Sequence, residues 1–504
     1  MAALLRARPV GDLEFDNSPK REPATPMQAF LLAYACGILW YMGTCYWIYD
    51  TMHQYGGISP PLALLILFLF SLYLGLYHGL FGLLIGLMAA RGREHSFQTW
   101  RSLAAAPFLW VAVELARTRV TGFPWNLLGI AQVDNAALSR IAQWTGVYGI
   151  SFEIVVINVA IAAAFLVPRK KRSPLLIAAL ASAAVLQAGR LIEPPASIAD
   201  HTALLVQENI PVGTDWNRPL LIESTLNELS GLSEQSSSAA TAKAATGGAF
   251  KTKLIVWPES PAPFFTNDPL FRNAMSEMAR QTRAWVVTGA IGTIPALRGS
   301  GQGSQVFNSA ALIGPGGDWT TRYDKVHLVP FGEYLPFPSL FSFAGGLTKE
   351  VGEFTPGQSR ISLQAGDARL GLFICYESIF PDDVRQFADQ GAQVFVNISN
   401  DGWYGDSGAY AQHLSQTRMR AIENNRWLLS ATNTGVTASI DPWGRLAAQI
   451  PRKVRATLLA PYSLTSVTTF YTRHGDWFAF LCAIISTGAL LLRFTSRKKA
   501  EPSP

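Results

Sequence analysis

The sequence LGLFICYESIFPDD occupies residues 370–383 and combines a short apolar run with a cysteine, a turn and a helix start. The run at 370–374 contains only apolar residues and glycine, which is typical of a strand buried on both faces of a sheet. Cys375 follows this run directly, and Pro381 with two aspartates marks the first turn of a helix. A cysteine at such a strand–turn–helix junction is a candidate nucleophile, because backbone N–H groups of the turn favour its thiolate. The alternative is an inert core cysteine, which is the commoner role of a lone cysteine.

The region around this segment alternates between apolar runs and polar, helix-compatible stretches. Runs rich in β-branched and aromatic residues occur at 201–207, 253–257, 285–289, 307–313, 370–374, 393–398 and 427–433. Helix-compatible stretches occur at 218–235, 269–283, 381–390 and 409–425. Residues 236–248, rich in Ser, Ala, Thr and Gly, are predicted to be a mobile surface insertion. The alternation predicts a layered α/β domain of roughly 260 to 280 residues, which is ample for one core.

Apolar segments outside this domain are long enough to cross a membrane. Hydrophobic residues make up 49% of the 504 residues and charged residues only 15%, whereas soluble domains contain roughly 25% charged residues. The excess lies in six stretches, at 27–49, 62–90, 103–120, 148–168, 174–192 and 477–492. An α-helix needs about 20 apolar residues to cross a ~30 Å hydrocarbon layer. We therefore expect six spans, although the third and fifth stretches could instead be buried helices of a soluble core.

Basic residues indicate the orientation of these spans. Lys and Arg are concentrated around residues 6–21, 91–101, 169–172 and 493–499. With six spans, all four clusters fall on one side, and the positive-inside rule makes that side the cytoplasm. The α/β domain is therefore expected on the opposite side, which in a bacterium is the periplasmic face of the inner (cytoplasmic) membrane.

Two charged residues lie inside the third apolar stretch. Glu114 and Arg117 are three residues apart and would share one face of a helix. A local ion pair near the membrane surface is the simpler interpretation, and a functional relay is the alternative. The same pair is the only feature that favours a transporter with the α/β domain as a binding module.

Two further charged residues stand where active sites can form. Glu259 ends the apolar run LIVWPE at 254–259, and a carboxylate at a strand end can enter a site at the sheet edge. A surface turn is an equal alternative for this residue. Lys325 lies in RYDKVHLVPFGEY at 322–334, which has no clean period, so it is either an exposed cation or a donor held in a cleft. His327 could act as a base for Cys375, although a surface or packing role is the simpler interpretation.

Other motifs that carry chemistry are missing from the sequence. The four cysteines have no CxxC spacing, and the seven histidines have no HExxH or other metal spacing. The sequence contains neither a P-loop nor a dinucleotide fingerprint. A net charge of +6 over 504 residues is too small to suggest nucleic-acid binding. We therefore expect no metal, no cofactor and no nucleic-acid partner.

Glu259, Lys325 and Cys375, in that order, resemble the Glu-Lys-Cys triad of the nitrilase or carbon–nitrogen hydrolase superfamily. The surrounding sequences match as well: WPES at 257–260, YDKVHLVPFGE at 323–333, CYE at 375–377 and NISNDGWYG at 397–405. Such a domain between an N-terminal membrane bundle and one C-terminal span resembles the apolipoprotein N-acyltransferase family, over nearly the whole chain from about residue 27.

This resemblance implies an α/β fold, with a nitrilase-like αββα sandwich inserted between membrane helices. The polar N-terminal segment would comprise residues 1–26 and a transmembrane bundle of about five helices residues 27–192. The catalytic domain would comprise residues 193–474, and a C-terminal transmembrane helix with a basic tail residues 475–504. Members of the family usually have eight spans, so two fewer are predicted here, and an even difference keeps the catalytic domain on the same side.

The resemblance also implies a role for each motif. Cys375 would attack the sn-1 ester of a phospholipid, with phosphatidylethanolamine as the expected donor, and form a thioester. Glu259 would be the general base, and Lys325 would stabilise the oxyanion. The acceptor would be the N-terminal diacylglyceryl-cysteine amine of an apolipoprotein. Residues that would bind substrate or support the site are Trp216, Glu333, Tyr376, Glu377 and Trp403. A membrane-tethered amidase that hydrolyses a small amide is the alternative with the same triad.

Overall fold

The chain divides into a helical unit and an α/β unit. The structure is a computed structural model that describes residues 8–9, 21–22, 24–89, 95–166, 169–218, 220–245, 253–259, 262–295, 304–336 and 354–498. The helical unit contains the chain up to Tyr49, Pro60–Glu193 and the residues from His474 onward. The α/β unit contains Asp50–Ser59 and Pro194–Arg473. Most of the expected polar segment 1–26 lies outside the described residues.

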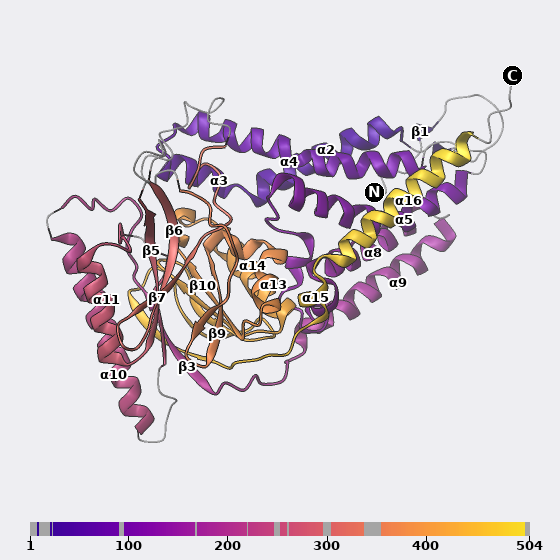
Figure 1. The fold of residues 1–504 in the computed structure, drawn as a ribbon. Helices are drawn as coiled ribbons and strands as arrows, with labels where there is room; N and C mark the ends of the chain where they lie inside the picture. The colour runs from indigo at the N-terminus through magenta and orange to yellow at the C-terminus, as the bar shows by residue number, and fades with distance from the viewer. Residues whose placement is uncertain are drawn as a thin grey trace, which may run out of the picture. The chain divides into compact units, whose positions relative to one another are not determined.

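The helical unit is built from long helices joined by short ones (Figure 1). Its long helices are α2 (Pro26–Thr44), α4 (Pro60–Ala89), α5 (His95–Ala116), α8 (Val147–Leu166), α9 (Arg169–Gln187) and α16 (Trp477–Lys498). The shorter elements are α3 (Trp47–Asp50), η2 (Arg117–Thr121), η3 (Leu128–Gln132), α6 (Ala136–Ser139), α7 (Ala142–Thr145) and η4 (Ala188–Leu191).

Five helices in the described part of the chain are long and apolar enough to cross a membrane. They are Pro26–Thr44, Pro60–Ala89, Val147–Leu166, Arg172–Leu191 and Trp477–Thr495. These helices correspond to five of the six predicted spans. The third predicted span is also helical, as α5, but α5 is not among the five. Arg101 and Glu114 lie within this helix and lower its hydropathy.

Glycine allows α2 and α4 to pack closely against each other. A Cβ atom on Gly82 of α4 would lie 2.4 Å from the Ala29 carbonyl oxygen of α2. A Cβ atom on Gly79 would lie 2.7 Å from the ring of Phe30. Small residues spaced in this way let two helix backbones approach each other, which is how membrane helices gain packing energy.

The α/β unit contains two six-stranded sheets. The order of the first sheet is β13-β12-β11-β10-β9-β8, and that of the second is β14-β3-β4-β5-β6-β7. The first comprises β8 (Leu363–Ala365), β9 (Ala368–Ile374), β10 (Val394–Ser399), β11 (Leu428–Thr432), β12 (Thr437–Ile440) and β13 (Leu446–Ile450). The second comprises β3 (His201–Gln207), β4 (Leu254–Val256), β5 (Trp285–Ile294), β6 (Gln305–Ile313), β7 (Trp319–Asp324) and β14 (Ala456–Tyr462). Parallel pairing joins β9, β10 and β11 in one sheet and β3, β4 and β5 in the other.

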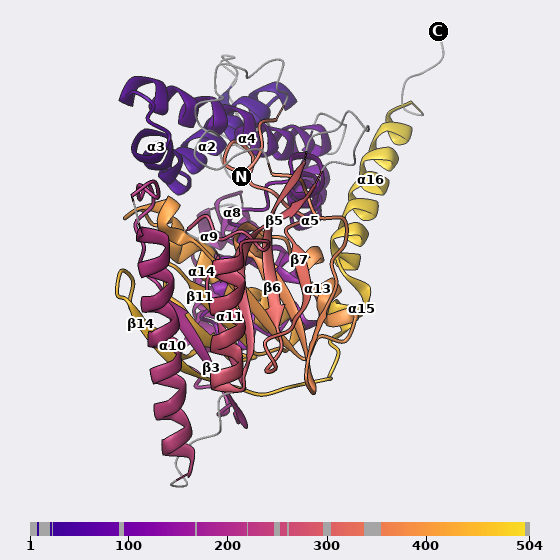
Figure 2. The same cartoon turned by 60° about the vertical axis from the view of Figure 1, so that its left-hand side comes forward.

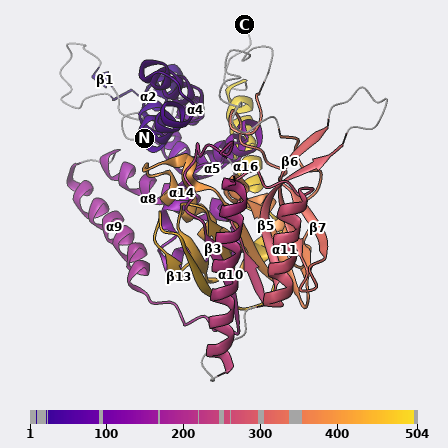
Figure 3. The same ribbon diagram turned by 90° about the vertical axis from the view of Figure 1, so that its left-hand side faces the viewer.

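The alternation of side chains along the strands produces four layers. Leu205 of β3 faces a core shared with strands of the first sheet, such as Leu372 of β9. The preceding residue, Leu204, points to the opposite face of the sheet, into a second core beneath α10 (Leu221–Ala245) and α11 (Pro269–Thr282). Figures 2 and 3 show these two helices side by side along the second sheet. On the first sheet, α13 (Pro381–Asp389) and α14 (Ala409–Asn424) contribute residues to the core. The unit is therefore the expected αββα sandwich.

One local prediction is wrong. Residues 236–245 continue α10 rather than forming a mobile insertion, while residues 246–248 lie outside the described part of the chain. Ser237 and Ala240 in this part of the helix are 2% exposed. Packing of these small side chains stabilises a helix that their composition alone does not indicate.

Candidate active site

Cys375 lies at the turn between β9 and the short helix η6 (Cys375–Ile379). Its φ angle is 49°, in the left-handed region that side chains other than glycine rarely adopt. Two hydrogen bonds hold this turn. The Ile374 N–H donates to Glu377 Oε2 at 2.8 Å, and His413 Nε2 lies 3.1 Å from the Cys375 carbonyl oxygen. The cysteine is 7% exposed, so its thiol is buried inside the α/β unit.

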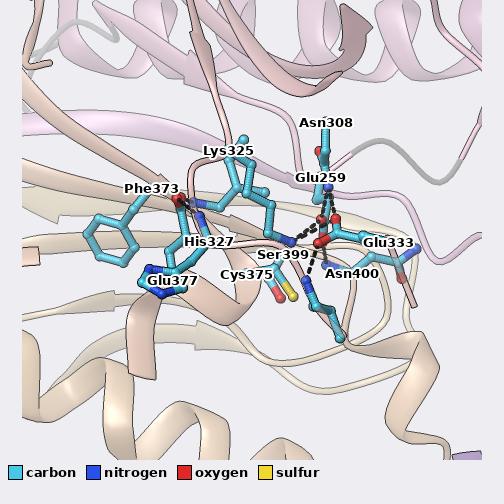
Figure 4. A network of polar contacts seen from close by, with 12 residues as sticks. Glu259, Asn308, Lys325, His327, Glu333, Phe373, Cys375, Glu377, Ser399 and Asn400 are labelled. Atoms are coloured by element: carbon cyan, nitrogen blue, oxygen red, sulfur yellow. Dashed lines mark hydrogen bonds and ion pairs between the residues drawn. The ribbon is translucent and has the colours of Figure 1, made fainter. Parts of the chain in front are cut away.

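Lys325 follows β7 and is 1% exposed. Its ammonium donates to Glu333 Oε1 at 2.9 Å and to Glu259 Oε1 at 3.4 Å. The Asn308 amide donates to the same two oxygens, at 2.6 Å to Glu333 and 2.7 Å to Glu259. Figure 4 shows this cluster with the sulfur of Cys375 near the ammonium end of Lys325. The structure therefore brings the three sequence-predicted triad residues together, with Glu333 as a fourth member.

Backbone N–H groups fix both carboxylates of this cluster. Glu259 lies just beyond the end of β4, after Trp257 and Pro258, and its Oε2 accepts from the Asn400 N–H at 2.8 Å. Glu333 Oε2 accepts from the Val329 N–H at 2.8 Å. Each carboxylate thus uses one oxygen for the backbone and the other for Lys325 and Asn308, which leaves the cluster little freedom to rearrange.

Two side chains of this cluster, Lys325 and Cys375, have raised pKa values, for different reasons. Burial alone would lower the pKa of the Lys325 ammonium, but the carboxylates of Glu333 and Glu259 outweigh burial and raise it. Burial raises the pKa of the Cys375 thiol well above its ordinary value, the Glu259 charge adds to this, and the Lys325 charge opposes it. At neutral pH the site therefore contains an ammonium and a protonated thiol, so a reaction at the sulfur needs a base.

Glu377 joins the strand that precedes Cys375 to the segment that carries Lys325. Its Oε1 accepts from the Tyr323 hydroxyl at 2.8 Å and from the Val326 N–H at 2.8 Å. Its Oε2 accepts from the Ile374 N–H at 2.8 Å. A single buried carboxylate therefore connects β7 of one sheet to β9 of the other. This connection helps to position the Cys375 thiol relative to the Lys325 ammonium.

The other three predicted site residues are placed differently. Tyr376 is 5% exposed and packs edge-on against Phe380, with ring centroids 5.2 Å apart. Trp216 is half-buried against the core beneath α10 and α11. The Trp403 carbonyl accepts from the Thr51 hydroxyl at 3.1 Å, and its ring meets Tyr55 edge-on at 5.8 Å. Trp403 thus contacts the short segment that precedes α4 in the chain.

His327 is held by α13. Its Nδ1 lies 2.5 Å from Asp383 Oδ2, and its ring stacks on Phe380 at 3.8 Å. Arg360 forms an ion pair with the same aspartate at 2.9 Å. These contacts agree with the packing interpretation of His327.

A second polar network, not anticipated from the sequence, lies behind the turn. His413 of α14 contacts Asp401 Oδ1 at 3.2 Å, the Ser378 hydroxyl at 2.8 Å and the Cys375 carbonyl. Burial alone would lower the pKa of His413, but the Asp401 carboxylate raises it above its ordinary value. Burial alone would raise the pKa of Asp401, but His413 lowers it. The two groups thus stabilise each other's charged forms, and His413 Nε2 lies beside the carbonyl oxygen of Cys375.

Sequence reasoning also missed Asn308 and His413 as members of the site. An asparagine inside the strand β6 was the available signal for Asn308, because asparagine is depleted in strands. His413 lies in a helix with many polar residues, so nothing in the sequence distinguished it.

Two family models match the chain. The model of the carbon-nitrogen hydrolases matches residues 183–471. The model of the apolipoprotein N-acyltransferase N-terminal domain matches residues 18–160. The two matches follow the division of the chain into an α/β part and a helical part.

Curated relatives match along almost their entire length. The apolipoprotein N-acyltransferase of Geobacter metallireducens is 34% identical over 484 residues, which cover 94% of this chain and 88% of the relative. That of Methylococcus capsulatus is 33% identical, covering 95% of this chain and 90% of the relative. Among solved structures, a carbon-nitrogen hydrolase from Helicobacter pylori G27 is 20% identical and covers 52% of this chain and 88% of that chain, with a TM-score of 0.37. The chain belongs to the apolipoprotein N-acyltransferase family, whose catalytic part is a carbon–nitrogen hydrolase domain.

Proposed function

We propose that this protein transfers a fatty acyl chain from a phospholipid to the N-terminal diacylglyceryl-cysteine amine of an apolipoprotein, through a thioester on Cys375. Its relatives carry the name of this activity. One feature of the site supports it most strongly: a buried ammonium shared by two fixed carboxylates lies within electrostatic reach of the thiol. This arrangement supplies a base, a nucleophile and a cation at one point.

In the first half-reaction the thiol attacks the sn-1 ester of the phospholipid. Glu259 accepts the thiol proton as the sulfur bonds to the carbonyl carbon, which is needed because the pKa of Cys375 is raised. The Lys325 ammonium faces the negative charge that develops on the carbonyl oxygen. The ester C–O bond then breaks, the lysophospholipid oxygen takes the proton from Glu259, and an acyl thioester remains.

In the second half-reaction the acceptor amine attacks the thioester. Glu259 takes a proton from the nitrogen as the new C–N bond forms, and Lys325 again faces the oxyanion. The C–S bond breaks and the sulfur recovers the proton, so an amide leaves and the free thiol returns. The two substrates use one thioester in turn, and ping-pong kinetics are therefore expected.

The donor and the location are further parts of the proposal. Phosphatidylethanolamine is the proposed donor, and the α/β unit is proposed to lie on the periplasmic side of a bacterial inner membrane. The basic clusters of the sequence support this orientation. Glu333, Tyr376 and Glu377 are proposed to support the site, and Trp216 and Trp403 to contact substrate. The side chain of Trp403 is half-buried next to Tyr55, so part of it is accessible for a contact with substrate.

The test incubates the purified protein with phosphatidylethanolamine and a synthetic diacylated lipopeptide and follows the mass of the lipopeptide. The expected product is heavier by one acyl chain, and Cys375→Ala is expected to form none of it. A Cys375→Ala protein that transfers at the normal rate would exclude the thioester. Release of the acyl chain only as free fatty acid, with either protein, would favour a hydrolase over a transferase.

A further inference from the structure

The end of β10 and the loop after it reach both the proposed base and the nucleophile. Asn400 donates its backbone N–H to Glu259 Oε2 at 2.8 Å (Figure 4). The next residue, Asp401, accepts from the Ser399 hydroxyl at 2.6 Å through Oδ1. The Ser399 side chain is in turn hydrogen-bonded to the side chain of Cys375. Three consecutive residues therefore connect the carboxylate of the base to the sulfur of the nucleophile.

His413 of α14 connects Asp401 to the backbone of Cys375 as well. Its Nδ1 lies 3.2 Å from Asp401 Oδ1, and its Nε2 lies 3.1 Å from the Cys375 carbonyl oxygen and 2.8 Å from the Ser378 hydroxyl. A carboxylate and a carbonyl only accept hydrogen bonds, so a ring with protons on both nitrogens donates to both of them. Burial opposes this form of the ring, but the Asp401 carboxylate outweighs burial and raises the pKa of His413. Both side chains are buried, at 2% and 4% exposure, so little water competes for these contacts.

The backbone at Cys375 requires such support. Its φ angle of 49° is one that residues other than glycine keep only where the surrounding structure determines it. Before the cysteine, the Ile374 N–H is fixed by Glu377 at 2.8 Å. After the cysteine, its own carbonyl faces His413. The two contacts together determine the direction in which the side chain of the nucleophile leaves the turn.

We propose that Asp401 and His413 are positioning residues that hold the Glu259 carboxylate and the Cys375 thiol at a fixed separation. Asp401 acts through Ser399 and the adjoining Asn400 N–H, and His413 acts through the Cys375 carbonyl. Proton transfer requires the base within hydrogen-bond reach of the thiol. A small displacement of either group therefore slows the reaction strongly. The effect on rate rests on the proposed function, whereas the separation of the two groups does not.

Alkylation of Cys375 by iodoacetamide tests the separation without requiring acyl transfer. Burial raises the pKa of Cys375 and the Glu259 charge raises it further, so Glu259→Gln should move the pH profile of alkylation to lower pH. The size of this shift depends on how close the carboxylate lies to the sulfur. In a protein that carries His413→Gln, the same substitution should therefore produce a smaller shift. Asp401→Asn, which keeps the size of the side chain, should have the same effect and serves where His413→Gln fails to fold.

Asn424→Ala provides the matched control on α14. Asn424 is buried at the end of this helix and accepts from the Thr472 hydroxyl at 2.8 Å. Its replacement should lower the midpoint of thermal unfolding but leave the full Glu259→Gln shift, because the described contacts of Asn424 do not reach the site. A full shift in the His413→Gln and Asp401→Asn proteins as well would overturn the proposal.

The kinetics of acyl transfer measure the consequence for the proposed reaction. His413→Gln and Asp401→Asn are each expected to lower kcat by about tenfold to a hundredfold and to leave KM for both substrates nearly unchanged. Because the two residues act through one set of contacts, the double variant should lose no more than the worse single variant. Multiplied losses in the double variant, or a normal kcat in both single variants, would contradict the proposal. Asn424→Ala should keep its kcat.

The two measurements separate this inference from the proposed function. A wild-type protein that transfers no acyl chain, with a reduced alkylation shift in the His413→Gln protein, would reject the proposed function and support the positioning role. Normal transfer by the wild type, with a full shift in both variants, would support the function and reject the positioning role.

Discussion

At the scale of single residues, the site depends on how one buried cation is shared. Lys325 donates to two carboxylates, and Asn308 donates to the same two oxygens. Breaking a buried pair from one side leaves an uncompensated charge, which typically costs about 3–5 kcal/mol. The cluster is therefore a fixed electrostatic environment for the thiol, and the pKa of Cys375 reports on it directly.

The rate at which iodoacetamide alkylates Cys375 should reveal this environment. Burial and the Glu259 charge raise the pKa of the thiol above the ordinary cysteine value of about 8.5. Alkylation should therefore be slow at neutral pH and should accelerate only at a pH above that ordinary value. Glu259→Gln removes the neighbouring negative charge, so the alkylation curve should move to lower pH although transfer is lost. Mass analysis of the Cys375 peptide separates it from Cys36, Cys45 and Cys482. A curve that moves to higher pH in Glu259→Gln would contradict the electrostatic assignment.

His413 should make the stability of the protein depend on pH near neutrality. Asp401 raises its pKa in the folded protein above the unfolded value of about 6.5. The groups that face His413 include Asp401, Ser378, the Cys375 carbonyl, the Tyr404 ring and, at longer range, Glu259. The proton stabilises the fold fully below about pH 6.5, and this contribution is lost as the pH rises through the folded pKa.

The midpoint of thermal unfolding, measured between pH 5.5 and 8.5, checks this. The wild-type midpoint should fall through the upper part of this range because of His413, and His413→Gln should remove that part of the slope. Equal slopes in the two proteins would show that His413 is neutral when folded.

At the scale of elements, glycine determines how closely α2 and α4 approach. Gly82→Ala would place a methyl group 2.4 Å from the Ala29 carbonyl oxygen. Overpacking of this kind costs about 1–3 kcal/mol, so the unfolding midpoint should fall. Gly43→Ala on α2 is the matched control, because nothing lies within 4 Å of its added Cβ, and alanine favours a helix over glycine. Equal stability of the two variants would show that the helices do not pack as described.

The sequence predicted elements well where the residues are apolar and periodic. Each of the seven predicted strand runs overlaps a strand, and 201–207 coincides with β3. The strands β7, β8, β12, β13 and β14 were missed, because β7 (WTTRYD) and β13 (LAAQI) are polar or short and take their structure from neighbouring strands. The helical extension at 236–245 was also missed, because its small and polar residues are typical of a loop. Ser237 and Ala240 nevertheless pack in the structure.

At the scale of the whole molecule, the site is assembled from distant parts of the chain. Glu259, Lys325 and Cys375 follow the ends of β4, β7 and β9, and these strands lie in two different sheets. The order of these three residues and the sequence motifs around them indicated the family. No local pattern, however, predicts that Asn308 bridges the two carboxylates or that Glu377 bonds to both sheets. Such contacts follow from the packing of the sandwich, which periodicity does not specify.

The acyl-enzyme itself offers the most direct measurement. The purified protein is mixed with phosphatidylethanolamine alone, and its intact mass and the mass of the Cys375 peptide are recorded before and after a diacylated lipopeptide is added. We predict an increase of one acyl chain on Cys375, which is cleaved by hydroxylamine and disappears as the lipopeptide gains the same mass. An acyl group attached to another residue, or a Cys375 adduct that the lipopeptide does not remove, would contradict the mechanism.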